Sequence, residues 1–228
     1  MLDWLLIDLD NTLLDFNAGA NRSLIEAMMA FEIEPSSQHI HTYHEINHQC
    51  WEAFEKGEFD ISTLRRKRFE LFVEVLDVDV NADRINAFYL DRLSQQTDEI
   101  AGARTFLDWA HSRYRLVLAT NGFASVQWPR IRKAQLLPYF EHILISEEIG
   151  VQKPAGGFFD HAFHRMEFPE KDRVMIIGDS LSSDIEGGRS YGIRTCWLRH
   201  ESACGSDSED NMHFEVSSLS EIPALLAT

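Results

Sequence analysis

The sequence is poor in cysteine and in basic residues, and each shortage excludes a class of protein. Three cysteines, Cys50, Cys196 and Cys204, form no C-x-x-C pair, so neither a disulfide framework nor a zinc knuckle is indicated and a reduced, cytoplasmic compartment is expected. Only 21 Lys and Arg stand against 37 Asp and Glu, a formal net charge of -16. This charge disfavours binding to nucleic-acid polymers and anionic membrane surfaces. Any anionic substrate must be met by a local cation.

Long apolar runs are missing as well. No run approaches the roughly 18 residues that a membrane-spanning helix needs. The N-terminus has no basic segment and instead meets Asp3, Asp8 and Asp10. The sequence therefore predicts neither a secreted nor a membrane-spanning protein. A length of 228 residues and a hydrophobic content of 44% fit a globular core domain that carries a smaller domain.

Residues 16–98 show a helical pattern without a convincing strand. Apolar side chains recur at helical spacing in four segments, Asn21 to Phe31, Ile46 to Phe54, Leu64 to Leu76 and Ile85 to Leu93. These helices follow directly after one short apolar run. The pattern predicts a helical cap domain, residues 16–98, inserted into a core domain made of residues 1–15 and 99–228.

The core sequence alternates short apolar strands with helices. Helices are expected from about Ala103, Ser125, Pro154 and Asp184, and strands at Trp4 to Ile7, Arg115 to Ala119, His142 to Ile145, Val174 to Ile177 and Arg194 to Leu198. Strands that are apolar throughout and are separated by helices predict a parallel sheet buried on both faces. The expected fold class is α/β, a doubly wound parallel sheet with an inserted helical cap.

Three further assignments concern the C-terminal part. The polar stretch Glu201 to Asn211 is expected to be a solvated loop. Phe214 to Val216 is expected to be a short edge strand. Ser218 to Glu221 has the spacing of a capping box for a last helix.

Chemically reactive side chains follow four of the predicted strands or the turns after them. Carboxyl ends of parallel strands meet at one edge of a sheet, so we expect these groups to converge. They are the acid pair Asp8 and Asp10, the turn Thr120-Asn121-Gly122, the cation Lys153, and the acids Asp179 and Asp184. Hydroxyl, amide and ammonium groups suit phosphate oxygens, and clustered carboxylates suit Mg²⁺. The set is typical of phosphoryl transfer.

These motifs resemble those of the haloacid-dehalogenase-like superfamily. D-x-D-x-T follows the first strand at Asp8, a threonine follows the second at Thr120, Lys153-Pro154 comes next, and G-D-x-x-x-x-D begins at Gly178. The resemblance implies that Asp8 attacks phosphorus and that Asp10 is the general acid and base. It also implies that Thr120, Asn121 and Lys153 hold the phosphoryl group. Mg²⁺ would lie among Asp8, the Asp10 carbonyl, Asp179 and Asp184.

Within that superfamily the sequence is most similar to bacterial pyrimidine 5′-nucleotidases, which implies hydrolysis of dUMP, dTMP or UMP. The similar segments are Ile145 to Pro154, Thr120 to Phe123 and the cap pattern from Asn47 to Phe69. N-acylneuraminate-9-phosphatases share D-L-D-N-T and T-N-G and are the alternative. A phosphomutase would keep all four motifs and stays open. Asp10 argues against a dehalogenase, and the complete set of catalytic positions argues against a non-enzymatic binding module.

The cap contains other groups that need an interpretation. His39, His41, His44 and His48 are expected to form a solvated face rather than a metal site. Arg65 to Arg68 are expected to be salt-bridged, with one of them aimed at the substrate. The expected partner is a small phosphomonoester bound by a monomer or a weak homodimer. The candidates to contact its base are Phe16, Phe123, Trp51, Asn47 and Arg68.

Overall fold

A six-stranded parallel sheet forms the centre of the molecule. The computed structural model describes residues 2–199 and 213–227, so the predicted loop Glu201 to Asn211 and Cys204 lie outside the described residues. The strand order is β3-β2-β1-β4-β5-β6, and every neighbouring pair is parallel. The strands are β1 (Trp4–Ile7), β2 (Arg115–Thr120), β3 (His142–Ile145), β4 (Val174–Gly178), β5 (Arg194–Leu198) and β6 (His213–Val216). The predicted doubly wound sheet is confirmed, including its edge strand β6.

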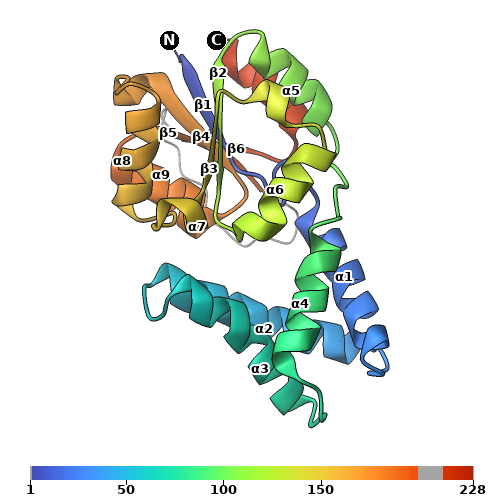
Figure 1. The fold of residues 1–228 in the computed structure, drawn as a ribbon. Coiled ribbons are helices and arrows are strands. Elements are labelled where there is room, and N and C mark those ends of the chain that lie inside the picture. Colours follow the sequence, from blue (N-terminus) through green and yellow to red (C-terminus); the bar gives the residue numbers. More distant parts are fainter. Residues whose placement is uncertain (1, 200–212, 228) are drawn as a thin grey trace.

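Helices cover both faces of the sheet because successive side chains of the buried strands point to opposite sides. Leu5 and Ile7 of β1 pack into one hydrophobic cluster with α5 (Ala103–His111), α6 (Ala124–Lys133), the 3-10 turn at Leu219–Glu221 and α10 (Ile222–Leu226). Trp4 and Leu6 pack into another with α8 (Gly156–Arg165). α9 (Gly187–Tyr191) lies beside α8 on that second face (Figure 1).

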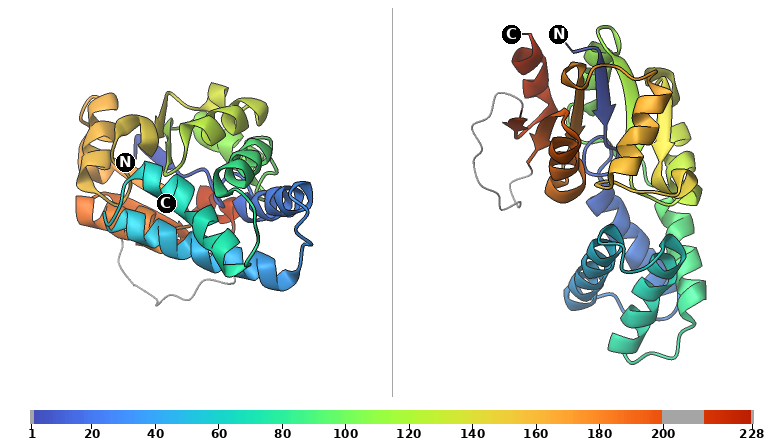
Figure 2. Two further views of the ribbon diagram at one scale, coloured as in Figure 1. Left: turned by 60° about the horizontal axis from the view of Figure 1, so that its bottom comes forward. Right: turned by 90° about the vertical axis from the view of Figure 1, so that its left-hand side faces the viewer.

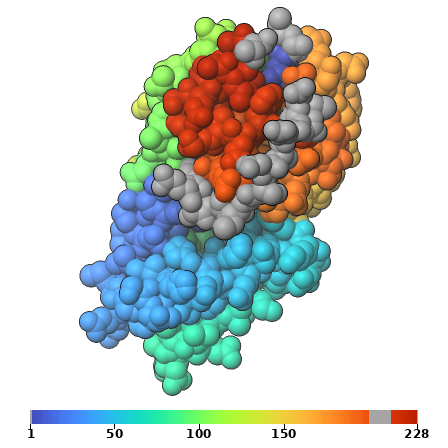
Figure 3. Space-filling view, turned by 180° about the vertical axis from the view of Figure 1, so that it is seen from behind, coloured from blue at the N-terminus to red at the C-terminus, as the bar shows by residue number. Residues whose placement is uncertain are grey.

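Four helices between β1 and α5 form the cap. They are α1 (Phe16–Ala30), α2 (Ser37–Glu55), α3 (Ile61–Val75) and α4 (Ala82–Leu93). Their shared core is aromatic, with Tyr43, Phe69, Phe72 and Tyr89 buried against one another. The right-hand view of Figure 2 shows this helical lobe below the sheet, and the space-filling view of Figure 3 shows the two lobes in contact.

The chain crosses between core and cap twice, at neighbouring places. The Asp15 N–H donates to the Asp98 carbonyl at 2.8 Å, and Leu14 forms a bridge with Glu99. Asp15 also caps α1 by accepting from the N–H of Ala18. The two crossings therefore leave the core side by side. The predicted domain boundaries at 15/16 and 98/99 stay a prediction.

Two cap helices begin earlier than their apolar patterns indicated. α1 begins at Phe16 and α2 at Ser37, because Asp15 and Ser36 provide capping oxygens to the first turns. The first turns of α2 are polar and largely solvent-facing, so apolar residues do not recur there at helical spacing and the pattern does not predict the start of the helix. Among the described residues no helix is both long and apolar enough to cross a membrane.

Candidate active site

Asp8 continues the line of β1 into the edge of the sheet. Its backbone N–H donates to the carbonyl of Ile177 at 2.9 Å, and the residue is 6% exposed. Burial raises the pKa of the Asp8 carboxyl to about 7, with repulsion from Asp184 and Asp10 adding to the effect and Lys153 opposing it. An ionised Asp8 therefore needs positive charge beside it.

Lys153 supplies that charge from the turn before α8. Its ammonium donates to Asp8 Oδ1 at 2.7 Å, to Asp184 Oδ1 at 2.6 Å and to the carbonyl of Ala119 at 2.6 Å. Burial opposes the charge, but Asp184 and Asp8 outweigh it and raise the pKa of Lys153. The three donors of the ammonium are thus all used inside the protein.

Asn121 fixes the backbone of this lysine. Its Nδ2 donates to the Lys153 carbonyl at 2.7 Å, and its Oδ1 accepts from the Lys153 N–H at 2.9 Å. The side-chain amide is therefore committed to positioning Lys153, a role that the sequence pattern did not distinguish from direct phosphate contact. Thr120, just before it, is buried at the end of β2.

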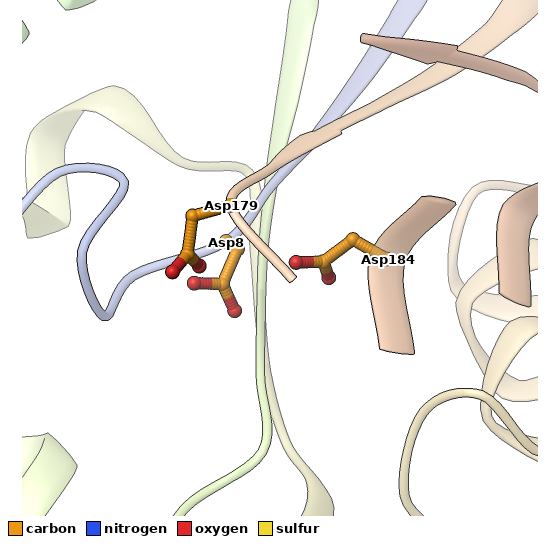
Figure 4. A group of neighbouring side chains, drawn as sticks. All are labelled: Asp8, Asp179 and Asp184. Carbon is orange, nitrogen blue, oxygen red and sulfur yellow. The ribbon is translucent and has the colours of Figure 1, made fainter. Parts of the chain in front are cut away.

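Asp179 and Asp184 complete an acidic cluster with Asp8. One carboxylate oxygen of each residue lies within 4.8 Å of the others, and Figure 4 shows the three side chains converging. Burial, then repulsion from Asp8 and Asp184, raises the pKa of Asp179. Oxygen ligands at this spacing fit a hard divalent cation, which would also offset the repulsion.

A π-helical turn delivers Asp184 to the cluster. Residues Leu181–Glu186 form this turn, and Ser180 caps it by accepting from the N–H of Ser183. Asp184 Oδ2 accepts from the N–H of Ser180 at 3.2 Å. A side chain on Gly178 would stand only 2.1 Å from that same oxygen, so glycine is required for the approach.

Asp10 faces two residues that the sequence analysis missed. Its Oδ1 accepts from Arg130 Nη1 at 2.5 Å, and its Oδ2 accepts from Gln127 Nε2 at 2.8 Å. Gln127 also donates to the Thr120 hydroxyl at 2.9 Å. Both residues are 1% exposed and stand three apart on α6. The sequence predicts that both residues lie on a helix of the core. It does not show which strand end this helix covers, so their contact with Asp10 could not be predicted.

The cap closes one side of the site. Asn47, Trp51 and Glu55 share one face of α2 at i, i+4 and i+8, and they line the same cavity as Asp8 and Asp179. Trp51 lies 5.9 Å from the ring of Phe123, centroid to centroid. The cavity encloses about 230 Å³ and is also lined by Phe16 and Arg68. All five residues predicted to contact a base thus surround it.

Polar contacts connect the cap with the core around this cavity. Arg65 of α3 pairs with Glu147 at 2.6 Å, and Glu147 lies on the short helix α7 (Ser146–Ile149). Glu55 Oε2 accepts from the Ser182 hydroxyl at 3.1 Å. Gln152 donates to the carbonyl of Phe54 at 3.1 Å. These contacts hold the cap over the carboxylates.

The other charged groups of the cap form local pairs. His41 lies near Glu45 and His48 near Glu52 along exposed turns of α2, and His44 bonds to Asn21. Among the described residues, the cluster able to hold a metal is the one formed by Asp8, Asp179 and Asp184, and it contains no histidine.

Three comparisons place these features among known proteins. The family described as haloacid dehalogenase-like hydrolase matches residues 2–192. Pyrimidine 5′-nucleotidase YjjG of Escherichia coli is 31% identical over 198 residues, 86% of this chain and 85% of that protein. Pyrimidine 5′-nucleotidase PynA of Streptococcus pneumoniae is 31% identical over 195 residues, 85% of this chain and 82% of that protein. The magnesium-bound structure of YfnB from Bacillus subtilis has a TM-score of 0.91 at 28% identity and covers 100% of this chain and 99% of its own.

Proposed function

Because this chain belongs to the haloacid dehalogenase-like hydrolases and is a phosphoric monoester hydrolase, we propose that it hydrolyses pyrimidine nucleoside 5′-monophosphates such as dUMP, dTMP and UMP. One observation carries the proposal: one small cavity is lined at one end by Asp8, which is paired with the buried Lys153, and at the other by the aromatic rings of Phe123 and Trp51. A phosphate ester fits the charged end, and a flat base fits the aromatic end.

In the first step, an oxygen of Asp8 attacks phosphorus and the bond from phosphorus to the ester oxygen breaks. Asp10 gives its proton to that oxygen as the nucleoside leaves. In the second step, Asp10 takes a proton from water, the water oxygen bonds to phosphorus, and the bond to Asp8 breaks to release phosphate. Arg130 and Gln127 hold the Asp10 carboxylate from behind, which restricts its rotamers.

The transferring phosphoryl group is held by the residues around Asp8. Lys153 offsets its charge, and Asn121 keeps Lys153 in place through two hydrogen bonds. The Thr120 oxygen accepts from Gln127, so its own proton is free to be donated to a phosphoryl oxygen. Positioning and charge neutralisation of this kind are what a loose phosphoryl-transfer state requires.

The carboxylate cluster fits Mg²⁺, which Asp8, Asp179 and the backbone carbonyl of Asp10 would hold. When bound, Mg²⁺ would neutralise charge on the phosphoryl oxygens and keep Asp8 ionised. Both oxygens of Asp184 already accept hydrogen bonds, from Lys153 and Ser180. Asp184 therefore suits a water-mediated contact better than a direct one.

We also propose that residues 16–98 act as a mobile cap on a core of residues 1–15 and 99–228. The paired crossings at Asp15 and Asp98 provide the hinge. Opening would break the contact between Arg65 and Glu147 and admit the nucleotide, and closing would exclude water from the acyl phosphate. A cytoplasmic location fits the buried, unpaired thiols of Cys50 and Cys196. We also propose that the protein is a monomer or a weak homodimer.

The size of the cavity favours a pyrimidine over a purine. Its 230 Å³ falls below the roughly 300–1,000 Å³ of typical ligand pockets. A one-ring base therefore suits it better than a two-ring base. An acidic sugar phosphate, as in N-acylneuraminate-9-phosphatases, is the competing substrate, because a buried arginine at the cap end could pair with its carboxylate.

The test is kcat/KM for dUMP, dTMP, dGMP and N-acetylneuraminate 9-phosphate with Mg²⁺ in one enzyme preparation. The proposal predicts the highest values for the two pyrimidine nucleotides. A higher value for the sugar acid phosphate would replace the proposed substrate with the competing one. Equal values for dUMP and dGMP would refute the size argument.

A further inference from the structure

Arg68 brings a buried positive charge to the cap wall of the cavity, and it has no acidic partner among the residues that the structure describes. The side chain is 2% exposed, its Nε donates to the Leu64 carbonyl at 3.2 Å, and its Nη1 donates to Asn47 Oδ1 at 2.8 Å. Among the described residues, its Nη2 has no hydrogen-bond partner. A buried donor left without an acceptor is costly, so this atom points to a ligand that supplies one.

Asn47 presents a second donor beside it. A guanidinium only donates, so the Asn47 atom that faces Nη1 must be the carbonyl oxygen Oδ1. Its other atom, the donor Nδ2, makes no hydrogen bond among the described residues, and Asn47 lines the cavity. We name Arg68 Nη2 and Asn47 Nδ2 the donor pair.

The donor pair is held rigidly against the aromatic wall. The guanidinium carbon of Arg68 lies 5.2 Å from the centroid of the Phe123 ring, and Phe123 in turn packs against Trp51. Glu55 of α2 also lines the cavity, but its carboxylate accepts a hydrogen bond from Ser182, near the acidic cluster. The aromatic end of the cavity is therefore lined at Arg68 and Asn47 by donors.

The chemistry of a bound nucleotide decides what these donors meet. With the phosphate at Asp8, the ribose is joined to N1 of a pyrimidine, and position 4 lies across the ring from N1. Position 4 carries a carbonyl oxygen in uracil and thymine and an amino group in cytosine. The oxygen accepts hydrogen bonds, whereas the amino group would place donors against donors.

We propose that the donor pair selects 4-oxo pyrimidine nucleotides over 4-amino ones, so that uracil and thymine nucleotides are substrates and cytosine nucleotides are rejected. This inference rests on the proposed function. A hydrogen bond from a charged donor to a buried acceptor corresponds to a preference of about 10- to 100-fold. We therefore expect kcat/KM for dUMP to exceed that for dCMP by this factor.

Two substitutions test the donor pair. Arg68→Met removes the charged donor while keeping a long apolar side chain against Phe123, and it should bring the ratio of dUMP to dCMP close to one. Arg66→Met is the matched control, because Arg66 lies two residues away on α3 and pairs with Glu70 at 2.8 Å at the surface. The control should keep the wild-type ratio.

Asn47→Asp is the sharper variant because it turns the neutral donor into an acceptor. One carboxylate oxygen would pair with Arg68, which keeps the arginine in place, and the other would accept from a 4-amino group. The ratio should move toward dCMP relative to wild type. This variant also decides the question if Arg68→Met does not fold, since it introduces no cavity and no unpaired charge.

The outcomes separate this inference from the proposed function. Suppose that kcat/KM for dUMP and dTMP is higher than for dGMP and N-acetylneuraminate 9-phosphate but equal to that for dCMP. The proposed function then stands and the inference is wrong. The inference would also be overturned if kcat/KM for dUMP is far above that for dCMP in the wild type and the ratio of the two values is unchanged in Asn47→Asp. If no pyrimidine nucleotide is preferred, both fail together.

Discussion

Replacing Lys153 by methionine should destabilise the metal-free protein strongly. The ammonium donates to Asp8, Asp184 and the Ala119 carbonyl, and methionine leaves all three acceptors buried without a partner. Removing one member of a buried ion pair costs about 3–5 kcal/mol. For a chain of this size each kcal/mol lowers Tm by about 2–4 °C. The expected fall in Tm is therefore about 6–20 °C.

The loss should grow with pH. Without Lys153 the opposing positive charge is gone, so the pKa of Asp8 in the folded state rises beyond its value of about 7. A folded pKa above the unfolded value means that the folded state binds more protons, so stability falls as pH rises from about 4 through the folded pKa. At pH 5.5 the Asp8 carboxyl is protonated, which relieves part of its repulsion with the neighbouring carboxylates. At pH 8 more of it is ionised, and this relief is lost.

The assay is chemical unfolding of wild type and Lys153→Met at pH 5.5 and 8 in the presence of a chelator. Lys56→Met is the matched control, because Lys56 is exposed and lies 3.8 Å from Glu52, and it should change the unfolding free energy by less than about 0.5 kcal/mol. A Lys153→Met variant within about 1 kcal/mol of wild type at pH 8 would refute the account of the buried charge network.

Further expectations concern the reaction, the metal and the cap. Asp8→Asn should fold normally and lose about 10³-fold or more in kcat, measured by phosphate release; substantial residual turnover would exclude Asp8 as the nucleophile. Asp10→Asn should impair dUMP hydrolysis far more than hydrolysis of an activated aryl phosphate, and equal losses would exclude Asp10 as the leaving-group acid. Mg²⁺ should raise Tm more at pH 8 than at pH 5.5. The pKa values of Asp8 and Asp179 are raised, so at pH 5.5 these carboxyls hold protons with which Mg²⁺ must compete; a larger rise in Tm at pH 5.5 would contradict this. Arg65→Met should raise KM more than it changes kcat by removing the contact with Glu147, and an unchanged KM would show that this contact does not bias the cap.

The strands and their reactive ends could be predicted from the sequence because two local signals coincide there. Buried strands such as Trp4–Ile7 are apolar throughout, and the polar residue that ends each run stands out. The predicted strands at His142–Ile145 and Arg194–Leu198 match the structure at both ends. Parallel topology then places Asp8, Lys153 and Asp179 at one edge without further information.

The supporting residues could not be predicted, because their roles depend on which parts of the fold meet. Arg130 and Gln127 read as ordinary polar positions of a helix, and only the packing of α6 over the strand ends brings them to Asp10. Asn121 directly follows β2, as the sequence predicts. Its commitment to the backbone of Lys153 depends on a contact 32 residues away in the sequence.

The central claim is that a pyrimidine nucleotide transfers its phosphoryl group to Asp8, and trapping the acyl phosphate tests it most directly. dUMP carrying a labelled phosphate is mixed with the wild type and Mg²⁺, quenched in acid during turnover and reduced with borohydride. The account predicts the label on the peptide containing Asp8 and, after reduction, homoserine at position 8. Asp8→Asn should show neither. Hydrolysis of dUMP by the wild type without label at Asp8, or with label on another residue, would contradict the account.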